Sequence, residues 1–158
     1  MAKILIGFMG AGKSTVSRLL DPDFQDMDDI ITEKIGMPIA AFFEKEGEDA
    51  FREIESETLS NLADSDSTVS TGGGVVESAR NRDILAKNGE TIYLKADFET
   101  LYQRIAADKG NQRPLFLNKS KKELASIFQE RQTWYEEVAS RVLDVTKLSP
   151  EEIIEELR

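Results

Sequence analysis

The chain has 158 residues, of which 40% are hydrophobic and 32% are charged, and these proportions predict one globular domain rather than a disordered chain. It contains no cysteine and no histidine, which excludes disulfides, thiolate nucleophiles, Cys- or His-ligated metals and a Ser-His-Asp triad. The formal net charge of −10 argues against nucleic acid or an anionic membrane as a partner, and any metal must be a hard cation bound by oxygen.

Short apolar segments and helical segments alternate along the chain. The predicted strands, in chain order, cover residues 3–7, 24–25, 68–71, 91–94 and 142–145. The predicted helices, in chain order, are one over 14–20, one that ends at Gly36, one from Pro38 to Gly47, one over 51–62, one over 78–87, one after Asp97, one over 120–139 and one that opens at Pro150. The alternation predicts an α/β fold, a three-layer sandwich in which a five-stranded parallel sheet carries helices on both faces.

Several helix boundaries have specific signals. Gly36 is typical of a left-handed C-cap, and Pro38 is placed for the first residue of the next helix. Ser120 with Glu123, and Ser149 with Glu152, match the capping-box pattern. Residues 108–119 carry turn formers and no periodicity, so they predict a mobile loop.

The strongest motif is Gly7 to Ser14, GFMGAGKS, which fits the Walker A pattern between a predicted strand and a predicted helix. Its glycines let backbone N–H groups turn toward a phosphate at the helix N-terminus. Lys13, expected at an exposed helix start, would reach the β and γ phosphates, and the Ser14 hydroxyl would bind Mg²⁺. The predicted nucleotide contacts of this loop are Gly10, Ala11, Gly12, Lys13, Ser14 and Thr15.

Two further segments follow predicted strands, at the edge where open α/β sheets bind ligands. Asp26 and Asp28 could divide between Mg²⁺ and a substrate hydroxyl, with an N-cap cluster that includes Asp29 as the alternative. Three glycines, Gly72, Gly73 and Gly74, would let the backbone approach a ligand closely, with a flexible turn as the alternative.

Three arginines are candidate anion ligands. Arg131 falls on the apolar stripe of its helix, and an inward guanidinium needs either an anionic ligand or a structural carboxylate. Arg52 flanks the inner face of its helix, and Arg113 lies in the predicted mobile loop; an ordinary surface arginine is the alternative for both. Neither the N-K-x-D nor the D-x-x-G motif of GTPases is present, so a GTPase switch is not expected.

In their order and rough spacing, these motifs resemble the shikimate kinase family, from Lys3 to about Pro150. The motifs that carry the resemblance are GFMGAGKST, the Asp26-Met27-Asp28 pair, Gly47-Glu48-x-x-Phe51-Arg52-x-x-Glu55, Ser70-Thr71-Gly72-Gly73-Gly74, Arg113-Pro114-Leu115 and Arg131-x-x-x-Tyr135. Two departures are visible. The stretch from Lys13 to Asp26 is about one helical turn shorter than is usual in the family, which predicts a truncated first helix, and residues 147–150 match the family's adenine loop only weakly.

The resemblance implies a single P-loop kinase domain over residues 1–158, with the fold of the nucleoside monophosphate kinases and a lid near 108–119. It implies transfer of the γ-phosphoryl group of ATP to the 3-hydroxyl of shikimate, with Mg²⁺ held by Ser14 and Asp26, in aromatic amino-acid biosynthesis. By motif match, Asp28 would hold the reacting hydroxyl, and Lys13 and Arg113 would act on the phosphates. The remaining implied contacts are Arg52 and Arg131 on the shikimate carboxylate, Gly72, Gly73 and Gly74 along its ring, and Pro150 against adenine.

We therefore expect a kinase of small molecules, monomeric, without nucleic-acid or membrane partners. No run of 18 apolar residues and no signal sequence is found, and with the missing cysteines this predicts a cytoplasmic protein. Two alternatives stay open: another small-metabolite kinase, such as one for gluconate, and a nucleotide-binding regulatory module without turnover.

Overall fold

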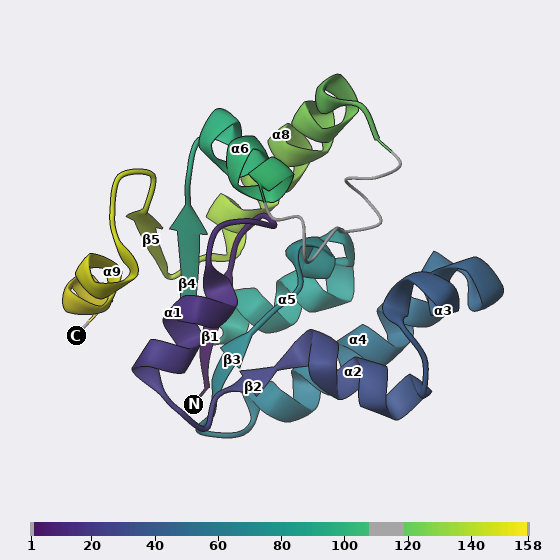
Figure 1. Ribbon diagram of the computed structural model, residues 1–158. Coiled ribbons are helices and arrows are strands. Elements are labelled where there is room, and N and C mark those ends of the chain that lie inside the picture. Colours follow the sequence, from purple (N-terminus) through teal and green to yellow (C-terminus); the bar gives the residue numbers. More distant parts are fainter. Residues whose placement is uncertain (1, 108–118, 158) are drawn as a thin grey trace.

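The computed structural model describes residues 2–107 and 119–157, and its centre is a five-stranded parallel sheet with the strand order β2-β3-β1-β4-β5 (Figure 1). The strands are β1 (Lys3–Ile6), β2 (Gln25–Asp26), β3 (Thr68–Ser70), β4 (Glu90–Lys95) and β5 (Arg141–Asp144). All four pairings between neighbouring strands are parallel. The predicted fold class is confirmed.

The central strand β1 is apolar without alternation because both of its faces are covered. Ile4, Leu5 and Ile6 are fully buried. Ile4 lies opposite Val69 of β3 on one side and Thr91 of β4 on the other. A parallel sheet with helices on both faces needs such continuous apolar strands, which is why the run was readable from the sequence.

The helices form two layers around this sheet. They are α1 (Lys13–Leu20), α2 (Met27–Ile35), α3 (Ile39–Glu46), α4 (Glu48–Ala63), the 3₁₀ helix η1 (Gly73–Glu77), α5 (Ala79–Lys87), α6 (Phe98–Ala107), α8 (Lys121–Val138) and α9 (Pro150–Leu157). Helix α1 packs against β3 and α9, while α4, α5 and α8 pack against one another in series, with α8 also against β4. Helix α3 has no buried residue and lies at the periphery, far from the sheet (Figure 1).

The predicted helix signals are confirmed apart from the position of Pro38, and the second strand begins one residue later than predicted. Gly36 is the C-cap of α2 with φ 71°, and Ser120 and Glu123 form a complete capping box. Pro38 is the N-cap of α3 rather than its first residue, because its ψ of 145° is extended although its ring fixes φ. The second strand begins at Gln25, because the Phe24 amide donates to the Asp21 carbonyl in a turn and cannot join the ladder.

The sheet topology gathers three loops at one edge. Strands β3 and β4 flank β1, so the loop after β1 lies at the point where the strand order reverses, and the loops after β2 and β3 lie beside it. Among residues 2–107 and 119–157, no helix is both long and apolar enough to cross a membrane.

Candidate active site

The loop between β1 and α1 has the conformation that its glycines predict. Gly10 and Gly12 have φ of 85° and 91°, values that residues with a side chain rarely adopt. Gly12 is the N-cap of α1, so the first amides of the helix and the positive end of its dipole face the loop. This arrangement suits a phosphate.

Lys13 is more enclosed than its predicted position at an exposed helix start. Its side chain is only 9% exposed, and its Nζ donates to the carbonyl oxygens of Gly7 (2.5 Å) and Phe8 (3.1 Å). The ammonium therefore lies inside the loop, where it is hydrogen-bonded to backbone oxygens.

Ser14 and Asp26 meet at the base of this loop. The Ser14 hydroxyl is 3.1 Å from Asp26 Oδ2 and 3.2 Å from Ser70 Oγ. The other oxygen of Asp26 caps α2, because it accepts the amide hydrogens of Asp28 (3.0 Å) and Asp29 (3.2 Å). The N-cap alternative and the metal-site prediction are thus compatible, since each uses a different carboxylate oxygen.

This oxygen pair fits Mg²⁺ by the chemistry of its donors. Mg²⁺ prefers hard oxygen ligands and is usually held by one or two protein groups together with waters and substrate phosphates. A hydroxyl and one carboxylate oxygen beside a phosphate loop match that need. No group of three acidic side chains that could hold a metal by themselves occurs in the part of the chain that the structure describes.

Two arginine side chains from different helices converge on Gly74. A Cβ atom placed on Gly74 would lie 2.7 Å from Arg52 Nη2 and 3.2 Å from Arg131 Nη2, so any side chain at this position would displace the two guanidinium groups. Two guanidinium groups this close together can bind one anion between them. A planar carboxylate fits their forked N–H donors. The structure thus brings together Arg52 and Arg131, the two residues expected at the carboxylate, and the glycine segment expected along the ring.

Each of these arginines also has a carboxylate partner in the protein. Arg131 is 8% exposed, and its Nε donates to Glu77 Oε2 at 2.7 Å. The structural partner considered for Arg131 is therefore Glu77, the last residue of η1. The pair uses only Nε, and Nη1 and Nη2 face Gly73 and Gly74.

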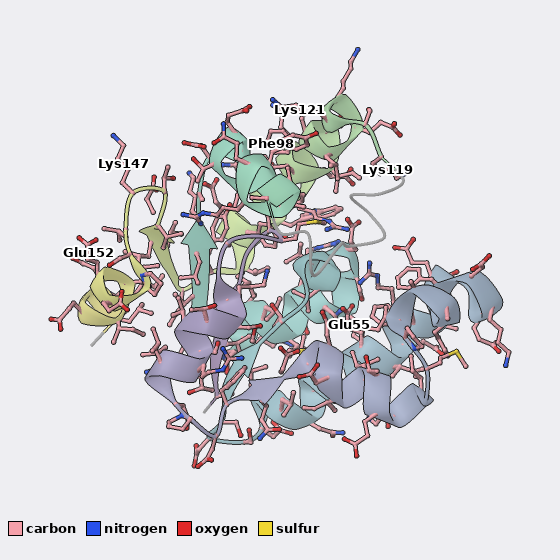
Figure 2. All side chains as sticks on the ribbon, viewed as in Figure 1. Glu55, Phe98, Lys119, Lys121, Lys147 and Glu152 are labelled. Carbon is pink, nitrogen blue, oxygen red and sulfur yellow. The ribbon has the colours of Figure 1, made fainter. Side chains whose placement is uncertain are left out.

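Arg52 is oriented by a buried acid, Glu55, one turn along α4. Glu55 is 2% exposed, and its Oε1 accepts from Arg52 Nη1 (2.9 Å) and Asn81 Nδ2 (3.0 Å). The Asn81 amide oxygen in turn accepts from Ser56 Oγ at 2.5 Å. Burial raises the pKa of Glu55, and the nearby Arg52 opposes this shift. Figure 2 shows Glu55 among the helices, whereas Lys147 points outward.

Asn81 and Ser56 were not singled out by the sequence analysis. Both side chains are polar and buried. Their burial could not be predicted, because their hydrogen-bond partners lie on a different helix, far away in the sequence. The i, i+3 spacing of Arg52 and Glu55 within α4 was the only local signal of this network.

Asp28 lies across the glycine segment from the arginines. Asp26 pairs with Ser70 between β2 and β3, and this register carries Asp28 alongside Gly72. A Cβ on Gly72 would lie 2.9 Å from Asp28 Oδ1. One glycine-lined surface therefore has a carboxylate at one end and two guanidinium groups at the other.

A cleft of about 270 Å³ runs beside the phosphate loop. Its lining includes Gly10, Gly12, Leu148 and Ile153, together with the predicted Pro150 and Arg104 of α6. The Arg104 guanidinium donates to the Gly10 carbonyl at 3.3 Å, so it is fixed to the phosphate loop. Arg104 was missed by the sequence analysis, because it is 94 residues away from Gly10 in the chain.

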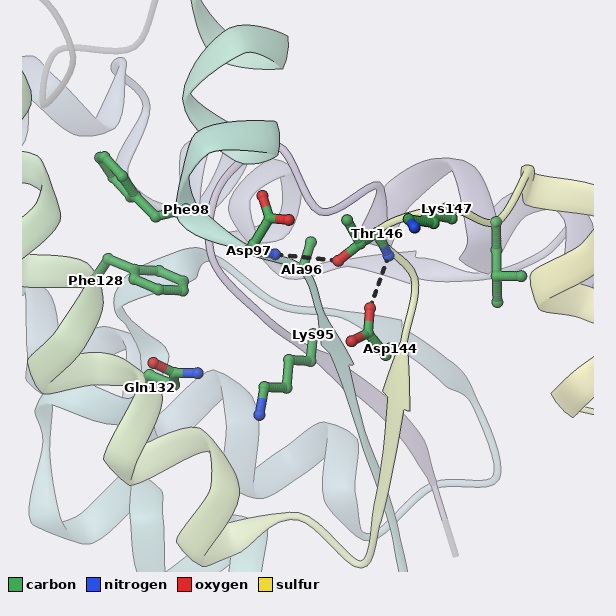
Figure 3. A pocket seen from close by; sticks show the side chains of 10 residues that line it. Lys95, Ala96, Asp97, Phe98, Phe128, Gln132, Asp144, Thr146 and Lys147 are labelled. Atoms are coloured by element: carbon green, nitrogen blue, oxygen red, sulfur yellow. Dashed lines mark hydrogen bonds between the residues drawn. The ribbon is translucent and has the colours of Figure 1, made fainter.

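A larger cavity, of about 580 Å³, shares the lining residue Leu148 with this cleft. Figure 3 shows the side chains around the larger cavity. Its acidic groups serve the fold: Asp97 accepts the Thr100 amide hydrogen (2.8 Å), and Asp144 accepts that of Thr146 (3.0 Å). Lys95 pairs with Glu136 at 2.7 Å. These three charged side chains all interact with other groups of the protein. Among the described residues, the larger cavity therefore lacks a set of charged groups directed at one point, such as the two arginines beside Gly74.

Arg113 and residues 108–118 of the predicted lid lie outside the described residues. The prediction of a lid arginine therefore stays a prediction.

The chain was compared with known proteins. The family model "Shikimate kinase" matches residues 9–158. A shikimate kinase of Streptococcus gordonii is 53% identical over 159 residues, which cover all of this chain and 99% of that protein. The chain also resembles solved structures, among them two kinases. A shikimate kinase from Acinetobacter baumannii in complex with shikimate has a TM-score of 0.88 and 34% identity, over 99% of this chain and 89% of that one. A gluconokinase from Sinorhizobium meliloti has a TM-score of 0.56 and 20% identity, over 97% of this chain and 86% of that one, and it shows the fold alone.

The family match covers the phosphate loop from Met9 onward, Arg52, Arg131 and the glycine segment, and the gluconate kinase alternative is not favoured. This chain belongs to the shikimate kinase family.

Proposed function

We propose that this chain is a shikimate kinase that transfers the γ-phosphoryl group of ATP to the 3-hydroxyl of shikimate, giving shikimate 3-phosphate and ADP. The observation that carries the proposal is the convergence of Arg52 and Arg131 on Gly74, with the Asp28 carboxylate at the far end of the glycines. This arrangement suits a small acid with a carboxylate at one end and a reacting hydroxyl at the other.

The phosphates of ATP bind at the loop between β1 and α1. The amides of the loop from Gly10 to Thr15 surround them, and Lys13 moves from its backbone partners onto the β and γ oxygens. The adenine ring enters the cleft between Pro150 and Arg104, where a guanidinium plane and a proline ring provide flat surfaces for stacking. Arg113 of the lid completes the charge around the transferred group.

The Ser14 hydroxyl and Asp26 Oδ2, which lie 3.1 Å apart, would hold Mg²⁺. When bound, the ion neutralises the charge of the phosphate oxygens. Asp26 is suited to this task because its other oxygen is fixed by two amide hydrogen bonds.

Shikimate lies along Gly72 to Gly74 with its carboxylate between the two arginines. Asp28 accepts a hydrogen bond from the 3-hydroxyl and directs its oxygen at the γ-phosphorus. The new P–O bond forms as the bond to the ADP oxygen breaks, and the hydroxyl proton leaves through Asp28 or to water. Phosphoryl transfer requires little covalent chemistry from the protein. The rate acceleration therefore comes from positioning the hydroxyl and the phosphoryl group and from stabilising the charge of the transition state.

The decisive experiment is a coupled assay of ADP release with ATP and Mg²⁺, with shikimate, with gluconate and without acceptor. Turnover that depends on shikimate is the expected result. Turnover with gluconate alone would assign another substrate, and nucleotide binding without any turnover would assign a regulatory module. The monomeric state, the single-domain organisation and the cytoplasmic location stay predictions.

A further inference from the structure

The start of η1 is hydrogen-bonded to a buried tyrosine of α8. The Tyr135 hydroxyl donates to the Gly73 carbonyl oxygen at 2.5 Å, and the tyrosine side chain is fully buried. Burial raises the pKa of Tyr135, so the phenol keeps its proton and stays a donor at neutral pH. The bond joins residues that are 62 positions apart in the chain.

This bond acts on the most pliable part of the candidate site. Three successive glycines lose more conformational entropy on ordering than other residues, so they need external contacts to hold one conformation. The peptide unit is planar and trans, and its C=O and N–H point in opposite directions. A donor that holds the Gly73 carbonyl therefore also fixes the direction of the Gly74 N–H.

The far end of η1 is held separately. Arg82 of α5 donates to the carbonyl oxygens of Val76 (2.7 Å) and Glu77 (3.2 Å), and its guanidinium stacks on Trp134. Arg131, one turn before Tyr135 on α8, holds the Glu77 carboxylate. With these contacts fixing Val76 and Glu77, the hydroxyl of Tyr135 determines where the glycine end of η1 lies relative to Arg131.

We propose that Tyr135 is a positioning residue of the acceptor site: its hydroxyl fixes the peptide between Gly73 and Gly74 so that this backbone and the Arg131 guanidinium are arranged for the acceptor before it binds. The inference rests on the proposed function, since the acceptor is shikimate. Tyr135 makes no contact with the phosphate loop in this account, so its effect falls on shikimate and spares ATP.

The chain offers a matched control on the neighbouring ring. Tyr93 of β4 is 1% exposed, and its ring lies 5.0 Å from that of Tyr135. Its hydroxyl has no hydrogen-bond partner among the described residues. Tyr93→Phe and Tyr135→Phe thus remove the same atom from two neighbouring, buried rings, and only the second change removes a bond to the glycine segment.

The experiment compares wild type, Tyr93→Phe and Tyr135→Phe by calorimetric titration with shikimate and by steady-state kinetics in both substrates. In Tyr135→Phe, a buried carbonyl loses its donor, so we expect the Kd and KM for shikimate to rise roughly 5- to 10-fold. The KM for ATP should stay within about twofold, and Tyr93→Phe should match wild type. Hydrogen exchange should accelerate only in peptides that cover residues 72–77.

Equal shikimate affinity in the two variants would overturn the proposal. So would a parallel rise of both KM values, or faster exchange across the whole protein, because either result assigns Tyr135 to general stability. The outcome is separable from the proposed function: wild type without shikimate-dependent ADP release refutes the kinase assignment, whereas active wild type with a normal Tyr135→Phe variant refutes only the inference.

Discussion

Arg131→Ala tests whether the inward arginine of α8 serves the ligand, the fold or both. The side chain is 8% exposed, its Nε binds Glu77, and its terminal nitrogens face Gly73 and Gly74. Alanine removes both sets of contacts at once. We therefore expect the variant to lose both shikimate affinity and stability, and the two losses have different physical causes.

The loss of affinity follows from the geometry of the two guanidinium groups. A unit charge about 4 Å from a carboxylate contributes about 4 kcal/mol at an effective dielectric constant of about 20. Arg52 remains in the variant and supplies part of this attraction. Truncating one desolvated partner typically costs about 2–5 kcal/mol. The lower value raises the Kd for shikimate roughly 30-fold, with the affinity for ATP little changed.

The loss of stability comes from Glu77, which would keep its charge without its cation. Breaking a fully buried pair costs about 3–5 kcal/mol. The Glu77 side chain is 24% exposed, so water replaces part of the lost attraction. We therefore expect the free energy of unfolding to fall by about 1–3 kcal/mol, below the fully buried range.

Two further variants separate these effects. Glu77→Gln keeps an acceptor for Arg131 Nε and removes the competing charge, so shikimate affinity should be retained or should increase. Arg131→Lys keeps the charge and loses the fork, so it should weaken shikimate binding although the site stays cationic. The assays are calorimetric titration with shikimate and thermal denaturation without ligand. Arg131→Ala with lowered stability and a normal Kd for shikimate would show that the arginine is purely structural.

Four other predictions follow from the site. Lys13→Ala should abolish turnover while the protein stays folded by circular dichroism, and near-normal turnover would remove Lys13 from the phosphate site. Asp28→Asn should lower kcat at least about 100-fold, whereas Asp26→Asn should mainly raise the Mg²⁺ concentration needed; the reverse pattern would exchange their roles. Arg113→Ala should lower kcat about 1,000-fold with little effect on the Kd for shikimate, and a loss confined to the KM for shikimate would contradict the lid role. Because burial raises the pKa of Glu55 in the folded state, its contribution to stability is full below the ordinary value of 4.5 and is lost as pH rises through the folded pKa. The melting temperature of Glu55→Gln relative to wild type should therefore increase as the pH rises above 4.5, and a constant difference would contradict this.

Most of the fold and the nucleotide side of the site could be predicted from local sequence patterns. Parallel strands covered on both faces need continuous apolar runs, and helix ends need specific caps, so β1, Gly36 and the Ser120–Glu123 box were readable locally. The Walker A loop is a contiguous motif whose geometry follows from its own glycines. Its strand–loop–helix context was therefore predictable without knowledge of the rest of the chain.

The pairing of side chains across the site could not be predicted, because it depends on how the helices pack in three dimensions. Arg131 could face a ligand or a carboxylate, and the packing of α8 on η1 selected Glu77 as its partner, 54 positions away. The contact of Arg104 with the phosphate loop and the bond from Tyr135 to Gly73 likewise join distant segments. Local sequence patterns reflect which residues cap helices and form turns, and how often apolar residues recur along a strand or helix. The partner of a buried polar group is fixed by how whole helices pack, and no short stretch of sequence contains that information.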